Sequence, residues 1–482
     1  MHPGQAAANR TKPRSLRHWR VGDLGEYNDD PKESEAIANV DFNSKAREPP
    51  SDISSLDTST RGLSPSQPAY GVSMTPEAIR DIVGSGWPGS RVESITPLAE
   101  GKSFNNTIYF LKMRHSEEAI ALGWQDAVLK VNGTLFDGDK VQNEVACLRL
   151  LEIYCPDIPV PRVLAWSEAG VSATFVSSTH AGTKFLGTSL TPGTVKRNSD
   201  GWVLISKVPG EPVDPMELDA ATIADLAIQL ADIVASWRHG IPPQKHCGSL
   251  KIRGEAKETT GDTADGIVLD RSCGPGIPDL AIRGILAEEI KLSTPITHIL
   301  DYYGIKLDNK LKQLESSSTY ARNRHLLGPL RTLRREHLPK LSFSEMFKQT
   351  ATPSDTFLFT HYDLYPRNVL VSGNPPRITG IVDWEFSGFF PPIDEFLDDW
   401  VDGDWPETFY TTYLERLEEK GVATPAKSVK GDAWQVAYWL EKIIENTAPW
   451  WLPGGLDADH VERALEKAEF VIWEMLGKLG CV

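Results

Sequence analysis

Long hydrophobic runs are missing from this sequence: no stretch of about 18 apolar residues occurs, and such stretches mark membrane spans. No apolar segment near the N-terminus precedes a small-residue cleavage site, so we expect no secretory signal. Cysteine is scarce, and the five residues form no Cys-x-x-Cys or Cys/His cluster; they are Cys147, Cys155, Cys247, Cys273 and Cys481. These absences argue against a disulfide framework and a zinc site, and they predict a protein of the reducing cytoplasm.

Positive charge is also in deficit. Lysine and arginine number 50 against 66 aspartates and glutamates, which gives a formal net charge of −16. Nucleic acids and anionic membranes attract proteins with a positive field, so we expect neither as a partner. The acid excess instead suits a cationic or metal-chelated ligand.

The first 70 residues are predicted to be a disordered tail. Residues 1–22 carry five basic side chains and no acid, a feature shared with mitochondrial presequences, but Pro3 and Pro13 interrupt the required amphipathic helix. From Asp23 to about Pro68 the chain is rich in Ser, Pro and Asp with few large apolar residues, so it cannot bury enough surface to offset the entropy of ordering.

A small lobe of sheet and helix is predicted over residues 76–208. Thr75 is a candidate N-cap followed by Pro76 at the first helical position. Short β-like runs follow at 106–111 and 127–131, then a helical segment around 143–151 and a strand at 202–206. Pro209 and Gly210 mark the linker that ends this lobe.

A larger and mainly helical lobe is predicted over residues 209–482. Its first helix, within 218–239, carries one apolar stripe. Residues 241–345 alternate Gly/Pro-marked loops with apparent helices at 296–303 and 308–314, and we interpret this region as a variable lid over the substrate. Short strands at 357–360, 369–371 and 378–382 precede further helices. The chain is therefore expected to be α+β.

The chemistry is concentrated in two segments, His361–Val371 and Ile378–Glu385. Asp363 and Asn368 are five positions apart, and Asp383 follows at the end of a strand. Phosphoryl transfer from a nucleotide needs a carboxylate that orients the acceptor, a neutral oxygen ligand for Mg²⁺ and a second carboxylate for the metal. Either segment alone could be an ordinary polar turn, but their combination in this order indicates a kinase site.

Here the sequence resembles the aminoglycoside phosphotransferase family, within the protein-kinase-like fold that also includes choline kinases. Similar proteins carry His-Gly-Asp-Leu-x-x-x-Asn and Ile-x-Asp-Trp-Glu, and this chain has His361-Tyr-Asp-Leu-Tyr-Pro-Arg-Asn368 and Ile381-Val-Asp-Trp-Glu385. The resemblance implies that Asp363 orients or deprotonates the acceptor hydroxyl, and that Asn368 and Asp383 hold Mg²⁺.

Two further residues of the catalytic segment have implied roles. His361 supports the loop, whereas Arg367 neutralises the transferred phosphate, pairs with Asp363 or simply lies on the surface. Tyr362 stands where the family has glycine, which puts the geometry of the loop in question.

The resemblance extends to the small lobe. Lys130 looks like the lysine that binds the α- and β-phosphates, and Glu144 on the following helix looks like its ion-pair partner, although Lys130 could also face solvent. The turn Glu100–Asn106 holds a single glycine; by resemblance Gly101 and Ser103 contact phosphates there. Residues 206–212 resemble the linker that contacts adenine.

Acidic residues gather beyond Asp383 and could bind a cationic acceptor or form a solvated surface; they are Asp394, Glu395, Asp398, Asp399, Asp402, Asp404 and Glu407. Trp450 and Trp451 could line a pocket or pack in the core.

The sequence thus predicts a bilobal small-molecule kinase that uses ATP and Mg²⁺ to phosphorylate a hydroxyl group. Two alternatives stay open. One is a kinase-like binding module without activity, which the glycine-poor turn Glu100–Asn106 favours, and the other is a choline or ethanolamine kinase. A protein kinase is disfavoured, because Asp-Trp-Glu replaces Asp-Phe-Gly and no Ala-Pro-Glu follows at the expected distance.

Overall fold

The computed structural model describes residues 68–99, 102–115, 125–133, 138–170, 172–179, 182–189, 195–196, 201–252, 267–269, 296–341, 356–397, 405–425, 433–449, 452 and 458–481. Nearly all of the predicted tail, Gly101 and the pair Trp450–Trp451 lie outside these ranges.

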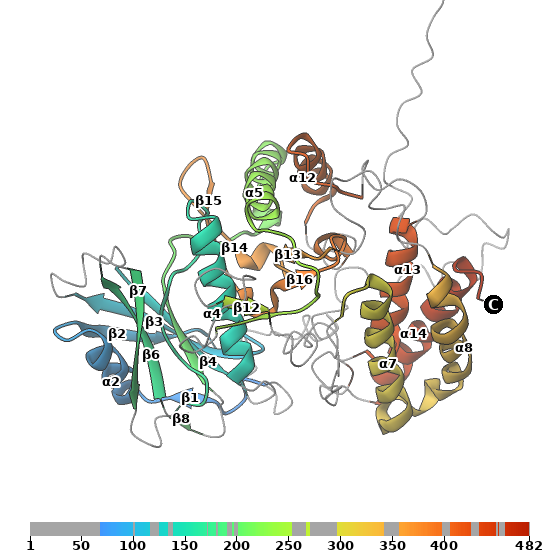
Figure 1. Cartoon of the computed structure of the whole chain (residues 1–482), viewed down its shortest axis with the longest axis horizontal. Coiled ribbons are helices and arrows are strands. Elements are labelled where there is room, and N and C mark those ends of the chain that lie inside the picture. Colours follow the sequence, from blue (N-terminus) through green and yellow to red (C-terminus); the bar gives the residue numbers. More distant parts are fainter. Residues whose placement is uncertain are drawn as a thin grey trace, which may run out of the picture.

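The N-terminal part of the fold is a seven-stranded antiparallel sheet in the order β2-β3-β4-β9-β5-β6-β7 (Figure 1). Its strands are β2 (Arg91–Pro97), β3 (Asn106–Arg114), β4 (Ala127–Asn132), β5 (Val163–Ser167), β6 (Ser172–Thr179), β7 (Gly182–Ser189) and β9 (Trp202–Ser206). A separate pair joins β1 (Ser73–Met74) to β8 (Val195–Lys196).

One helix packs on each face of the sheet. Side chains alternate between the two faces along every strand, so both faces present apolar residues that a helix can cover. On β9, Trp202 and Leu204 face the core that contains α2 (Pro76–Gly86), whereas Val203 and Ile205 face the core that contains α4 (Gly138–Tyr154). Helix α2 begins as predicted, with the Thr75 hydroxyl accepting the Ala78 N–H at 3.2 Å.

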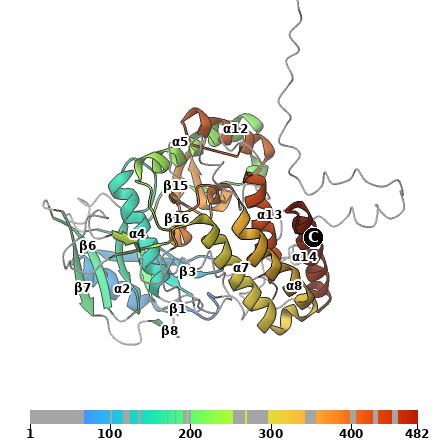
Figure 2. The ribbon, with the colours of Figure 1, turned by 45° about the vertical axis from the view of Figure 1, so that its right-hand side comes forward.

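The C-terminal part contains small sheets and many helices (Figure 2). Its strands are β10 (Glu211–Pro212), β11 (Leu250–Ile252), β12 (Ile267–Leu269), β13 (Leu358–Thr360), β14 (Val369–Ser372), β15 (Arg377–Ile381) and β16 (Gly388–Phe390). Strand β14 lies between β10 and β15, and β13 pairs with β16. Helix α4 lies between the seven-stranded sheet and these strands (Figure 1).

The helices of this part are α5 (Ala220–Gly240), α7 (Ile299–Ser316), α8 (Leu327–Thr332), α10 (Asp394–Leu397), α12 (Glu407–Glu419), α13 (Ala433–Asn446) and α14 (Ala458–Lys478). Short 3₁₀ or π turns cover Pro215–Glu217, Ser318–Leu326, Leu333–His337, Leu338–Lys340, Pro366–Asn368 and Trp384–Phe386. The two helical segments expected at 296–303 and 308–314 are one helix, α7, because no proline interrupts the 3.6-residue pattern between them.

Helix α5 is long and apolar enough to cross a membrane by length and composition. Its apolar residues are accounted for by packing, since Leu226, Leu230, Val234 and Trp237 are all buried in the core of the C-terminal part.

The bilobal α+β organisation expected from the sequence is thus confirmed, with a β-rich N-lobe and a mainly helical C-lobe. Part of the 241–345 region belongs to the hydrophobic core and not to a surface lid, because Tyr302, Tyr303 and Leu307 of α7 are buried. Its role as a lid stays a prediction. The four described cysteines are free.

The glycine before the central strand β9 should be irreplaceable. Gly201 has φ +121°, and a Cβ there would lie 2.2 Å from the Ser167 carbonyl oxygen. Gly201→Ala should lower the free energy of unfolding by at least about 2 kcal/mol, because both strain and clash oppose it. Gly477→Ala is the matched control, with open space at its Cβ on α14, and should raise it by up to about 1 kcal/mol. Denaturant titrations compare the two; equal stabilities would contradict the assigned backbone.

Candidate active site

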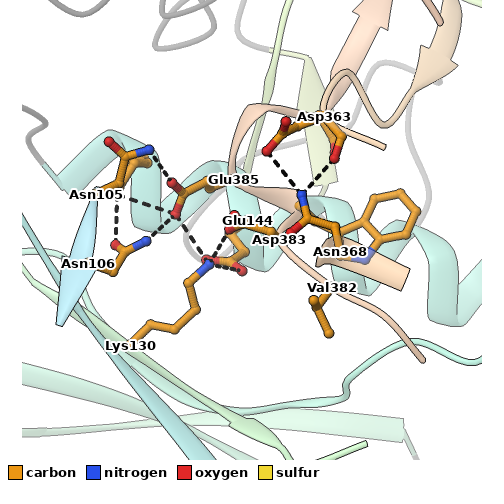
Figure 3. Close-up of polar contacts among 12 residues, drawn as sticks. Asn105, Asn106, Lys130, Glu144, Asp363, Asn368, Val382, Asp383 and Glu385 are labelled. Carbon is orange, nitrogen blue, oxygen red and sulfur yellow. Dashed lines mark hydrogen bonds and ion pairs between the residues drawn. The ribbon is translucent and has the colours of Figure 1, made fainter. Parts of the chain in front are cut away.

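Lys130 points from the sheet toward the C-lobe because of its position in the strand alternation. On β4, Leu129 and Val131 face the α2 core, so Lys130 between them faces α4. Its Nζ lies 2.7 Å from Oε1 of Glu144 on α4, 2.8 Å from Oδ1 of Asp383 and 3.2 Å from Oε2 of Glu385 (Figure 3). One buried ammonium therefore joins the N-lobe sheet, helix α4 and the segment after β15.

Three carboxylates decide the charge state of this lysine. Burial alone would lower the pKa of Lys130, but Asp383, Glu144 and Glu385 outweigh it and hold the pKa well above its usual value. Burial raises the pKa of Glu144 to about 7, although Lys130 opposes the shift. Burial also raises the pKa of Asp383, again against Lys130. Lys130 therefore stays charged.

Glu385 fastens the β2–β3 turn to the C-lobe. Its carboxylate accepts the side-chain amides of Asn105 at 3.1 Å and Asn106 at 2.7 Å, which end the turn predicted to bind phosphate (Figure 3). Lys140 at the start of α4 lies 3.3 Å from the same carboxylate. Burial would raise the pKa of Glu385, but Lys130 and Lys140 lower it to about 2. The carboxylate is thus a fixed anion between the lobes.

The loop that carries Asp363 and Asn368 is supported by the buried side chain of His361. This side chain is fully buried; its Nε2 donates to the Val382 carbonyl at 3.0 Å and its Nδ1 accepts the Asp363 N–H at 3.2 Å. Asn368 donates its side-chain amide to Asp363 twice, to the backbone oxygen at 2.7 Å and to Oδ2 at 3.0 Å. Arg367, half exposed, contacts Oδ1 of Asp363 at 3.1 Å. Both oxygens of Asp363 are therefore oriented.

Two residues of the site have left-handed backbone conformations, Tyr362 with φ 72° and Asp383 with φ 69°. The left-handed conformation costs a residue with a Cβ atom about 1–2 kcal/mol of conformational free energy, whereas it costs glycine little. Tyr362 therefore occupies a conformation that glycine adopts more readily than tyrosine.

Asn368 and Asp383 present oxygen atoms suited to Mg²⁺. The Asn368 nitrogen is turned toward Asp363, which leaves its Oδ1 available on the other side. Asp383 uses Oδ1 for Lys130, and its side chain is 31% exposed against 7% for Lys130. Carboxylate and amide oxygens are the ligands that Mg²⁺ prefers, commonly two from the protein with the remainder from phosphates and water. The donor set fits such a metal, and no cluster of three His, Cys, Asp or Glu side chains offers another metal site in the described residues.

The structure brings together five of the eight residues singled out in the sequence. Lys130 contacts Glu144 and Asp383, Asn368 contacts Asp363, and the Val382 N–H joins the two groups by donating to the Asn368 carbonyl at 3.0 Å. Arg367 joins them through Asp363. Ser103 lies half-buried in the β2–β3 turn, and Gly101 is outside the described residues, so their phosphate contacts stay predictions. Roles in binding and catalysis stay predictions for all eight.

The first two residues of the acidic segment beyond Asp383, Asp394 and Glu395, form neither a solvated surface nor an exposed site for a cationic acceptor. Asp394 is buried and accepts the hydroxyls of Tyr302 and Tyr303. Glu395 is buried and accepts the His361 N–H at 3.1 Å. These two acids support the core and the catalytic loop. Four of the others, Asp398, Asp399, Asp402 and Asp404, lie outside the described residues.

Sequence reasoning missed Glu385, Lys140 and the two asparagines as members of the site. Glu385 stood within the recognised Asp-Trp-Glu motif, which was the available signal. Nothing in the pattern indicated partners 279 and 280 positions away.

Comparison with known proteins gives one sequence match: residues 118–427 fit the profile of a family described as the phosphotransferase enzyme family. No curated protein matches the sequence. Solved structures with similar folds include an ADP-bound aminoglycoside phosphotransferase (14% identity, 83% of this chain and 99% of that one, TM-score 0.45). A macrolide 2′-phosphotransferase from Brachybacterium faecium (14%, 81% and 97%, 0.40) and an ethanolamine kinase from Plasmodium vivax (10%, 80% and 82%, 0.40) are others.

Buried His361 should make stability fall in weak acid. Burial lowers its pKa from 6.5 to about 4, so between these values the unfolded chain binds a proton that the folded one refuses, and stability is lost as pH falls. From pH 7.5 to 5 this amounts to about 2 kcal/mol. Denaturant titrations of His361→Asn should show a loss smaller by that amount, whereas the exposed control His239→Asn should match the wild type. An unchanged loss in His361→Asn would contradict the assignment.

Proposed function

Because the chain belongs to the phosphotransferase enzyme family, whose profile covers residues 118–427, we propose that it is a small-molecule kinase that transfers the γ-phosphoryl group of ATP to a hydroxyl group. The observation that carries this proposal is the 2.8 Å contact between Lys130 on the N-lobe sheet and Asp383 of the C-lobe. The segment of Asp383 is held beside the loop pair Asp363–Asn368, because the Val382 N–H donates to the Asn368 carbonyl at 3.0 Å. A nucleotide kinase needs this combination of groups in one cleft.

Side-chain exposure increases from the lysine cluster toward the proposed reacting groups. The side chains of Lys130, Glu144 and Glu385 are at most 7% exposed, whereas Asp363 is 17% and Asp383 31% exposed. Nucleotide phosphates that reach Lys130 from this side would replace Asp383 as its anionic partner. Glu144 and Glu385 would remain to hold the ammonium in position.

In the proposed reaction Asp363 binds the acceptor hydroxyl and takes its proton. The acceptor oxygen forms a bond to the γ-phosphorus while the bond from that phosphorus to the oxygen bridging to ADP breaks, so the products are ADP and a phosphate ester. Arg367, beside Asp363, can balance charge on the transferred group. Asn368 and Asp383 would hold Mg²⁺, which when bound neutralises charge on the phosphates.

The acceptor is a small molecule with a hydroxyl group in this proposal. Burial of Asp394 and Glu395 removes them from a surface that could bind a cationic acceptor, so the choline or ethanolamine alternative loses part of its support. The inactive binding module differs from the kinase in one observable: it would form no ADP.

Asp383→Asn tests the metal assignment. Calorimetric titration of the wild type with ATP should show binding that strengthens with Mg²⁺, and the variant should lose this strengthening because a ligand charge is gone. The fold should persist, since Lys130 keeps Glu144 and Glu385. Asp308→Asn, which alters an exposed aspartate paired with Arg334, is the matched control and should bind like the wild type. Full Mg²⁺ dependence in Asp383→Asn would refute the metal site; no binding by the wild type would refute the kinase.

Asp363→Asn tests the catalytic assignment. The variant should bind Mg²⁺-ATP normally but form ADP about 10²- to 10⁴-fold more slowly, because the group that receives the acceptor proton is lost. The measurement is ADP release with a panel of acceptors that includes aminoglycosides, a macrolide, choline, ethanolamine and simple sugars. Binding without turnover on the whole panel and on water would favour the inactive module. If Asp363→Asn forms ADP as fast as the control variant Asp308→Asn, the catalytic role of Asp363 is refuted.

A further inference from the structure

Tyr362 precedes the catalytic aspartate and keeps a left-handed backbone without being glycine. Three such non-glycine residues occur in the described part of the chain, Tyr362, Asp383 and Ala448. An unfavourable backbone conformation persists only where surrounding contacts determine it, and it tends to occur at functional sites. The contacts of the Tyr362 side chain therefore indicate what this residue does.

Those contacts come from the helical side of the C-lobe. The Tyr362 ring packs on Phe390 with centroids 5.0 Å apart, and its hydroxyl lies 3.3 Å from Nζ of Lys306 on α7. Lys306 in turn forms an ion pair with Glu441 on α13. Figures 1 and 2 both place α7 beside α13. One hydrogen bond thus links the residue next to Asp363 to a buried ion pair between two helices.

The ion pair is a rigid anchor. The Lys306 side chain is 3% exposed, and Glu441 outweighs the effect of burial so that the pKa of Lys306 lies above its usual value. The Lys306 ammonium also lies 5.1 Å from the ring centroid of Tyr302, whose hydroxyl donates to buried Asp394. Tyr362 is only partly buried and directly precedes the partly exposed Asp363, so it connects this cluster to the loop that carries Asp363.

We propose that Tyr362 is a positioning residue for Asp363: the Lys306–Glu441 pair fixes the tyrosine hydroxyl, and the tyrosine fixes the direction of the neighbouring carboxylate toward the acceptor. This inference rests on the proposed kinase function. His361 and Asn368 restrain Asp363 from one side of the loop, and Tyr362 restrains it from α7 and α13. Loss of the tyrosine hydroxyl should leave nucleotide binding intact, because Tyr362 contacts none of Lys130, Asn368 and Asp383 through a hydrogen bond within the described residues.

Tyr362→Phe keeps the ring and removes the hydroxyl. With Mg²⁺-ATP and water as the acceptor, ADP formation should slow between about 10- and 100-fold, because small misplacements of reacting groups have effects of this size. The KM for ATP should stay within about twofold of the wild type. In a cycle with Lys306→Met, the double variant should be no slower than Lys306→Met alone, since both changes break the same link.

Tyr320→Phe is the matched control. The Tyr320 hydroxyl donates to the Pro449 carbonyl at 2.8 Å in the same helical region, away from the catalytic loop. This variant should lose stability and keep the wild-type kcat. A merely structural tyrosine at position 362 would behave like Tyr320.

Hydrogen exchange supplies a readout that needs no turnover. Backbone amides of residues 361–368 should exchange faster in Tyr362→Phe than in the wild type or in Tyr320→Phe. If the wild type is active, an unchanged kcat in Tyr362→Phe overturns the proposal. Unchanged hydrogen exchange of residues 361–368 overturns it whether or not the wild type is active. A wild type that forms no ADP while Tyr362→Phe still loosens the loop would refute the proposed function and preserve the structural link.

Discussion

A buried ammonium surrounded by three carboxylates is the interaction on which the site depends. Taking Lys130 out of water costs several kcal/mol, and only the anions Glu144, Asp383 and Glu385 offset that cost. Because these anions come from α4 and from the segment after β15, the sheet, the helix and the C-lobe must meet correctly before the lysine can be buried. The same arrangement leaves Asp383 partly exposed, next to the loop that carries Asp363.

Much of this site was predictable, because its members lie in short motifs with fixed spacing. Asp363, Asn368 and Asp383 were identified by the order of the two catalytic segments, and Lys130 by its resemblance to the phosphate-binding lysine of the family. Glu385 was not given a role, because a carboxylate in a motif does not show which distant amides it accepts. Tyr362 departs from the family pattern, and the structure adds that its backbone is in the left-handed region that glycine adopts most readily.

The fold was predictable where periodicity is strong and not where it is weak. Helices α2 and α5 and strand β9 were expected at nearly the observed residues. Strands β6 and β7 were missed, because β7 reads Gly-Thr-Lys-Phe-Leu-Gly-Thr-Ser and lacks an alternating apolar face. The acids at 394 and 395 were misread, because composition indicates solvent, whereas tertiary partners such as Tyr302 and His361 allow both carboxylates to be buried.

Helix α4 has a consequence for where this chain can be divided. By sequence it belongs to the N-lobe, yet Val145, Leu148 and Leu151 lie in a hydrophobic core that also contains C-lobe residues such as Leu226 and Trp384. Asn143 of the same helix donates to the carbonyls of Glu385 and Ser387. A fragment cut at the linker after β9 would expose this apolar face to water and leave those carbonyls unsatisfied. Helix α4 is therefore a structural part of both lobes, and neither lobe by itself contains all the packing and hydrogen-bond partners that this helix joins.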